Sequence, residues 1–198
     1  ISGNYGFTFD KRNRSFMPTS GSVLSFGQTL PFYADKSFIA NTISASAYKT
    51  ISDDVIGASK IYIAAINGLG SDDVRLSKRK GLSSRRLRGF ERDKIGPVDG
   101  NDHIGGNYAA ALNFETNLPN LLPEGANTDV SLFLDFGNVW GVDYDASIDE
   151  SSKIRSSTGA SANWMSPIGP VSFTFAQNLS KANTDKTETF SFNLGTTF

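Results

Sequence analysis

The amino-acid sequence predicts an all-β protein, a transmembrane antiparallel β-barrel. Three observations indicate this fold class: apolar and polar side chains alternate along repeated segments, the segments have a similar length, and short connections alternate with long ones. The segments are about ten residues long, which is the length that crosses a membrane, whereas the strands of soluble sandwiches average about five or six residues. The predicted strands are therefore membrane-spanning.

Nine segments carry the alternation. The spacing i, i+3, i+4, i+7 of apolar residues, which is typical of an amphipathic helix, is not sustained anywhere in the sequence. The chain is therefore predicted to form strands joined by turns and loops, with these ranges: 3–13, 21–32, 37–50, 55–67, 105–118, 128–140, 154–165, 169–179 and 188–198.

The C-terminal segment TFSFNLGTTF shows the alternation most clearly. Its large apolar residues share one parity and its small or polar residues, Gly195 among them, share the other. Residues of one parity point to one face of a strand, so the segment has an apolar face and a polar face. The apolar face consists of Phe190, Phe192, Leu194 and Phe198.

Two acidic side chains are predicted on polar faces in the middle of the chain. In NYAAALNFETNL, Glu115 has the parity of Ala109 and Ala111, and in VSLFLDFG, Asp135 has the parity of Ser131. In a membrane barrel the apolar faces meet lipid and the polar faces line the interior. Both carboxylates are therefore expected to point inward.

The connections between the segments fall into two groups. The short or proline-bearing connections are 14–20, 51–54, 119–127 and 166–168. The long, acidic or polar connections are 68–104, 141–153 and 180–187. Short turns on one side of the membrane and long loops on the other are typical of outer-membrane barrels.

A soluble β-sandwich or soluble barrel is the alternative fold, because it would show the same alternation with the apolar face as its core. Aromatic residues near the ends of the segments favour the membrane barrel, since Trp and Tyr gather where lipid meets water. The residues predicted at these interfaces are Tyr108, Trp140 and Trp164.

Composition excludes several classes of function. The 198 residues contain no cysteine and one histidine, His103, which removes thiolate zinc sites, cysteine nucleophiles and multi-histidine metal sites. A formal net charge of −1 argues against a nucleic-acid-binding domain. No catalytic residue, metal or cofactor is predicted. Because Ile1 opens directly into an alternating segment, we expect the chain to be a piece of a longer protein.

A basic run interrupts this pattern in the longest connection, around the stretch RRLRGFERDKIGP. Its cations outnumber its acids, Glu91 and Asp93. Two interpretations stay open for most of them: a solvated surface that keeps the loop soluble, or contacts with lipopolysaccharide phosphates if the loop is extracellular. These cations are Lys78, Arg79, Lys80, Arg85 and Arg86.

Six motifs, in order along the chain, resemble the C-terminal barrel region of the BamA family of outer-membrane β-barrel assembly factors. The motifs are GFTFDKRNRSFMPTSGSVLSF, GLSSRRLRGFERDKIGP, GGNYAAALNFETNLP, FLDFGNVW, NWMSPIGPVSFTFAQNL and FNLGTTF. The resemblance implies that residues 1–198 form about the last nine strands of a sixteen-stranded barrel, with periplasmic domains and the first strands upstream.

The resemblance also implies a site inside the barrel. In this family the Arg-Gly-Phe loop folds back into the lumen, and its arginine contacts acidic residues on the inner wall. Carried over to this sequence, the lumenal latch would consist of Arg88, Gly89 and Phe90 from the loop, with Glu115 and Asp135 on the wall. Arginine suits this role because its planar guanidinium engages two carboxylates and keeps its charge away from water.

The function implied by the resemblance is assembly without ATP: the protein would catalyse folding and insertion of β-barrel proteins into the bacterial outer membrane. A client strand would pair with the weakly held last strand, which contains Gly195. The implied partners are unfolded outer-membrane clients, assembly lipoproteins bound by the upstream domains, lipid and lipopolysaccharide, and no nucleic acid. A relative in polypeptide secretion or translocation and a passive porin remain alternatives.

Overall fold

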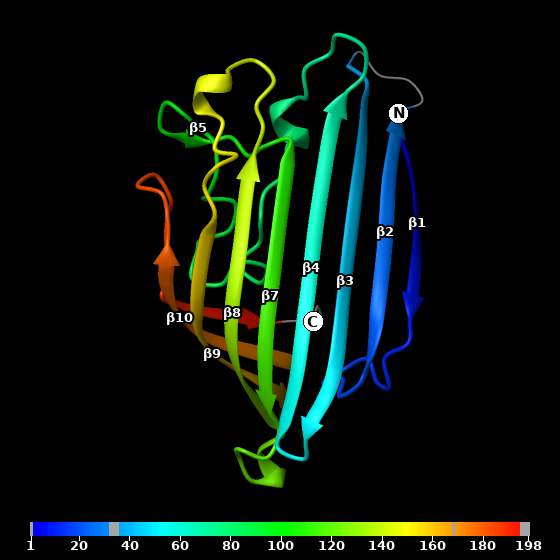
Figure 1. Cartoon of the computed structure of the whole chain (residues 1–198), viewed down its shortest axis with the longest axis vertical. Helices are drawn as coiled ribbons and strands as arrows, with labels where there is room; N and C mark the ends of the chain where they lie inside the picture. The colour runs from blue at the N-terminus through cyan, green and yellow to red at the C-terminus, as the bar shows by residue number, and fades with distance from the viewer. Residues whose placement is uncertain (1, 32–35, 168, 195–198) are drawn as a thin grey trace.

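The computed structural model describes residues 2–31, 36–167 and 169–194, and within them the long strands form a nine-stranded antiparallel sheet. Figure 1 shows these strands side by side in chain order. The strands are β1 (Ser2–Asp10), β2 (Gly21–Pro31), β3 (Phe38–Ser52), β4 (Val55–Gly68), β7 (Tyr108–Leu118), β8 (Thr128–Trp140), β9 (Arg155–Ser166), β10 (Gly169–Ser180) and β11 (Phe190–Leu194). The prediction of an all-β antiparallel fold is confirmed.

Short elements lie in the connections between the strands. The hairpin of β5 (Val98–Asp99) and β6 (Asp102–His103) was not predicted, because two-residue strands carry no alternation. Three 3-10 turns are also present in the part of the chain described: Leu76–Lys78, Glu124–Ala126 and Ala146–Ile148. Among the same residues, no helix is both long enough and apolar enough to cross a membrane.

The connections gather at two ends of the sheet, as alternating strand directions require. Figure 1 shows the long connections 69–107, 141–154 and 181–189 above the sheet or behind its upper part, and 119–127 at the opposite end. This arrangement agrees with the predicted division between turns and loops. Successive strands are antiparallel, so the connections on either side of a strand lie at opposite ends of the sheet.

The apolar faces of the strands point outward and the polar faces point inward. In β8, Leu132 is 53% exposed, whereas Ser131, Phe133 and Asp135 are at most 3% exposed. The same outward apolar face continues on the neighbouring strands, with Ile61, Ile63, Leu112, Phe114, Phe175, Phe190 and Phe192 exposed. A soluble sandwich would bury this face, so the soluble alternative is wrong.

A long loop packs against the inner side of the sheet. The connection 69–107, called the inner loop from here on, contributes Leu82, Leu87, Phe90 and Ile95 to one buried apolar cluster. They pack against small side chains of the strands, namely Ala64, Ala109, Ala111 and Val139. Small inward residues therefore leave room for the loop, and the core lies between the loop and the sheet.

A charge on the outward face provides a first test of the membrane orientation. Leu132→Arg is expected to lower the free energy of unfolding in lipid by about 2–4 kcal/mol, the cost of arginine near the bilayer centre on a barrel surface. Leu121→Arg is the matched control, because Leu121 is similarly exposed (59%) but lies in the connection between β7 and β8. Equal effects of the two substitutions, measured by denaturant unfolding in lipid, would contradict the assignment.

Candidate functional site

The inner loop is held by contacts within itself, with the connection 181–189 and with the sheet. Lys80 and Gly106, both in the loop, form an isolated antiparallel bridge, and Phe90 forms another with Thr187 of the connection 181–189. Midway along the loop, the Nδ2 group of Asn113 on β7 donates to the carbonyl oxygen of Arg86 at 2.8 Å. These contacts bring residues 86–90 against the inner faces of β7 to β10.

Arg88 makes the most extensive polar contacts of this segment. Its Nε donates to Oδ2 of Asp135 at 2.7 Å, its Nη2 to Oδ1 at 2.6 Å, and its backbone N–H to Oδ2 at 3.1 Å. Its Nη1 lies 2.7 Å from Oε1 of Glu115. One guanidinium therefore engages two carboxylates, one of them in a bidentate pair, which fixes its position more firmly than a single contact would.

A second cation completes the cluster of Arg88, Glu115, Asp135 and Lys60, called the Arg88 cluster below. Nζ of Lys60 on β4 lies 2.7 Å from Oε2 of Glu115. The two positive and two negative side chains balance in charge, as a buried ionic group requires. The guanidinium also lies over the ring of Phe133, 3.8 Å from its centroid.

The guanidinium of Arg88 remains charged in this setting. Its burial alone would lower the pKa of Arg88, but the hydrogen bonds and charges of Asp135 and Glu115 outweigh that effect, so the net pKa of Arg88 is raised. Removing either acid would leave a buried charge with less compensation, which is the costly case for ion pairs.

Gly89 follows with a backbone conformation that favours glycine. Its φ is +87°, and a Cβ built on it would lie 3.0 Å from Cβ of Ala176. The carbonyl oxygen of Gly89 accepts from Nδ2 of Asn178 at 2.8 Å and from the backbone N–H of Glu188 at 3.0 Å. Phe90 is then buried at 1% exposure among the apolar side chains of the inner loop.

The predicted interfacial aromatics lie near opposite ends of the strands. Tyr108 and Trp140 are direct partners across β7 and β8, with ring centroids 5.7 Å apart. The hydroxyl of Tyr108 donates to Oδ1 of Asn67 at 2.6 Å. Trp164 is exposed near the other end of β9, opposite Thr128 at the start of β8. The two groups are therefore separated along the strands in the way that two interfaces would require.

The predicted seam strand is described as far as Leu194. In the described residues β11 pairs with β10 and stands at one end of the sheet. On its outer face, Phe190 and Phe192 stack against Phe175 and Phe173 of β10, with centroids 4.8 Å and 5.4 Å apart. Gly195 and Phe198 lie outside the described residues.

The basic run does not behave as one surface. The guanidinium carbon of Arg86 lies 3.4 Å from the ring centroid of Tyr62, an inward residue of β4, so Arg86 belongs to the packing of the inner loop. Nearer the outer end, Lys78 lies over the ring of Phe38 and Arg79 over that of Tyr144. Sequence reasoning grouped these cations because it had no information on the path of the loop.

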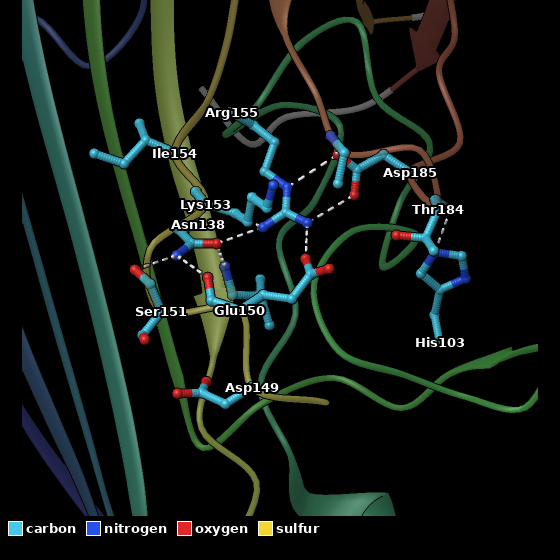
Figure 2. A network of polar contacts seen from close by, with 12 residues as sticks. His103, Asn138, Asp149, Glu150, Ser151, Lys153, Ile154, Arg155, Thr184 and Asp185 are labelled. Carbon is cyan, nitrogen blue, oxygen red and sulfur yellow. Dashed lines mark hydrogen bonds and ion pairs between the residues drawn. The ribbon is translucent and has the colours of Figure 1, made fainter. Parts of the chain in front are cut away.

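A second buried arginine, Arg155, was not singled out from the sequence. Figure 2 shows its guanidinium between Asp185, Glu150 and Asn138, which come from two connections and from β8. Arg155 is the second residue of the predicted strand 154–165 and Asp185 lies in a polar connection, and neither position carries a signal of burial. No group of three or more possible metal ligands occurs in the ranges that the structure covers.

These features define a class of protein. Antiparallel strands with apolar side chains outward, and an inner side occupied by polar groups and a folded-back loop, form the wall of an outer-membrane β-barrel. The chain belongs to the Omp85 superfamily, because the model of the Omp85 superfamily domain matches residues 1–198.

Individual relatives agree with this membership. The chain is 28% identical over 200 residues to an outer membrane protein assembly factor BamA of Neorickettsia risticii. The aligned region covers 98% of this chain and 27% of that protein. It is 32% identical to the BamA of Neisseria meningitidis, over 60% of this chain and 18% of that protein. A Sorting and assembly machinery component 50 homolog A of Xenopus laevis is 26% identical over 71% of this chain and 32% of that protein.

A solved structure agrees in fold. The crystal structure of BamA from Haemophilus ducreyi lacking POTRA domains 1–3 matches with a TM-score of 0.88 and 25% sequence identity, covering 96% of this chain and 41% of that chain. The chain therefore spans about a fifth to two fifths of the proteins it matches. It is an Omp85-family barrel related to the BamA and Sam50 assembly factors, a group distinct from classical enzymes.

Proposed function

We propose that residues 1–198 are the C-terminal part of the barrel of a bacterial outer-membrane assembly factor, which catalyses folding and insertion of β-barrel proteins through a lateral seam without ATP. The observation that supports this best is the Arg88 cluster, which holds a loop from the outer end against the inner wall. A porin needs an open lumen for its solutes, whereas here the inner loop occupies the inner side of β4, β7 and β8.

The edge strand supplies the other part of the proposed mechanism. Among the described residues, β11 is an edge strand of the sheet and pairs with β10. Backbone groups at a sheet edge bind an extended strand by β-augmentation, and inside a membrane this satisfies groups that lipid leaves unpaired. A client strand added beside β11 would gain these hydrogen bonds, which provide the driving force without ATP.

The proposed partners follow from this mechanism. Unfolded outer-membrane proteins would be the clients, and assembly lipoproteins would bind upstream domains of the longer protein. Lipid would contact the outward apolar face of the strands. Lys78 and Arg79, near the outer end, are the cations that we propose for lipopolysaccharide phosphates.

Reconstitution of the longer protein in liposomes tests the proposed function. The rate at which an unfolded outer-membrane β-barrel protein becomes inserted, read from its protease protection, is expected to exceed the rate with empty liposomes by roughly tenfold or more, equivalent to a barrier lowered by about 1.4 kcal/mol. A rate equal to that of empty liposomes, together with leakage of small solutes, would favour a porin or a secretion relative instead.

A further inference from the structure

Arg155 is a buried cation that the proposed function does not use. It is the first residue of β9, and its side chain is 0% exposed. Nη1 donates to Oδ1 of Asn138 on β8 at 2.6 Å, and Nη2 pairs with Glu150 of the connection 141–154. A buried guanidinium is stable only where its donors are hydrogen-bonded. These partners therefore compensate for the loss of water around Arg155.

Its strongest partner comes from the connection just before the last strand. Nε and Nη2 of Arg155 donate to Oδ2 and Oδ1 of Asp185 at 3.0 Å and 2.9 Å, a bidentate pair in which both side chains are 0% exposed. Oδ2 of Asp185 also accepts from the backbone N–H of Ala182 at 2.6 Å. Asp185 therefore shapes the turn of the connection 181–189 and attaches that turn to the wall.

The same connection is hydrogen-bonded to the inner loop. The backbone N–H of Glu91 donates to the carbonyl of Lys186 at 3.0 Å, and the N–H of Lys186 donates to the carbonyl of Lys94 at 3.1 Å. The N–H of Glu188 donates to the carbonyl of Gly89 at 3.0 Å, directly beside Arg88. Residues 186–188 thus lie alongside the inner loop, with an isolated antiparallel bridge between Thr187 and Phe90.

A third contact comes from the β5–β6 hairpin. Nε2 of His103 lies 3.0 Å from the carbonyl oxygen of Thr184, next to Asp185, as Figure 2 shows. The connection 181–189 therefore lies between the wall and the inner loop, of which this hairpin is a part. It leads straight into β11, which begins at Phe190.

We propose that Arg155 is a positioning residue: by anchoring Asp185, it holds the connection 181–189 in the place where that connection joins the inner loop to the start of β11. Two buried arginines then act in series. Arg88 fixes the inner loop to β7 and β8, and Arg155 fixes to β8 and β9 the segment that links this loop to the last strand.

The anchored connection also determines how the seam can open, a point that rests on the proposed function. If β11 separates from its neighbours during insertion, the connection before it must either move or serve as a hinge. The Arg155–Asp185 pair makes it a hinge, because the residues before Phe190 stay attached while the strand after it is free to swing.

Amide hydrogen exchange of the longer protein in nanodiscs, without client, tests the inference. The variant is Arg155→Met combined with Asp185→Asn, which removes both buried charges and keeps an acceptor for Ala182. The amides of Glu91, Lys186 and Glu188 are expected to exchange roughly tenfold faster or more, the factor expected when a charged hydrogen bond is lost, with β7 and β8 unchanged. Glu150→Gln is the control, since Glu150 is partly exposed and should alter these rates by about twofold at most.

Wild-type exchange at Lys186 and Glu188 in the double variant, or faster exchange confined to residues 149–155, would overturn the inference, because Arg155 would then support only its own connection. If the double variant does not fold, Arg155→Lys, which keeps the buried charge but cannot form the bidentate pair with Asp185, is expected to give the same pattern with a smaller increase. Hydrogen exchange is measured without client and needs no insertion activity. A failure of the insertion assay would therefore leave the result for Arg155 unchanged.

Discussion

Arg88→Glu is expected to release the inner loop from the wall and to abolish the acceleration of client insertion. The substitution places a third carboxylate beside Glu115 and Asp135, in a site where the side chains of all three partners are at most 11% exposed. Removing one partner of a buried ion pair already costs about 3–5 kcal/mol, and the added repulsion raises that cost. Protease cleavage within residues 69–107 and the insertion rate in liposomes measure the two effects.

Arg92→Glu is the matched control for this prediction. It makes the same charge change four residues away in the same loop, but the side chain of Arg92 is 79% exposed and pairs only with its neighbour Asp93 among the contacts described. Exposed pairs contribute little, about 0–1 kcal/mol. Arg92→Glu should therefore insert clients at the wild-type rate. Equal losses of insertion rate in the two variants would show that insertion depends on the charge of the loop and not on the buried contacts of Arg88.

Gly89→Ala is expected to lower the free energy of unfolding by about 2–5 kcal/mol, the second largest effect. Part of the cost is the left-handed backbone, with φ at +87°. The rest is crowding, because the new Cβ would lie 3.0 Å from Cβ of Ala176 and 3.2 Å from Nδ2 of Asn178. Denaturant unfolding in lipid or detergent measures the loss.

Gly100→Ala separates the two costs. Gly100 also has a positive φ, +63°, but no atom lies within 4 Å of the place where its Cβ would be. This control should show only the backbone cost of about 1–2 kcal/mol. If Gly89→Ala were no more costly than Gly100→Ala, the close fit of the inner loop against β9 and β10 would be wrong.

The strands could be predicted from the sequence because alternation is a local property. The facing of Glu115 and Asp135 followed from parity alone, and the structure places both on the inner side, within 2.7 Å of Arg88. The path of the inner loop could not be predicted from its own residues: a basic loop is normally solvated, and only the family resemblance indicated that Arg88 turns inward. The role of Arg88 as a latch remains a proposal.

The Arg155 network shows why the rest could not be predicted. Arg155 and Asp185 are thirty residues apart in sequence; Arg155 begins β9 and Asp185 lies within the connection 181–189. Their burial depends on how three connections fold over the end of the sheet, which is a tertiary effect without a local pattern. Arg86 was misplaced for the same reason, because its contact with Tyr62 depends on the path of the inner loop.

A double-mutant cycle on Arg88 and Asp135, read through the insertion rate in liposomes, tests the central claim most directly. Arg88→Met leaves the buried Asp135 without its cation, and Asp135→Leu leaves the Arg88 guanidinium with only Glu115, which Lys60 also contacts. Each single variant is therefore expected to remove most of the acceleration. In the double variant both charges are gone while Lys60 still neutralises Glu115, so the loss should be no greater than that of either single variant. Losses that add in the double variant would mean that the two side chains act independently, and would contradict a latch built on their contact.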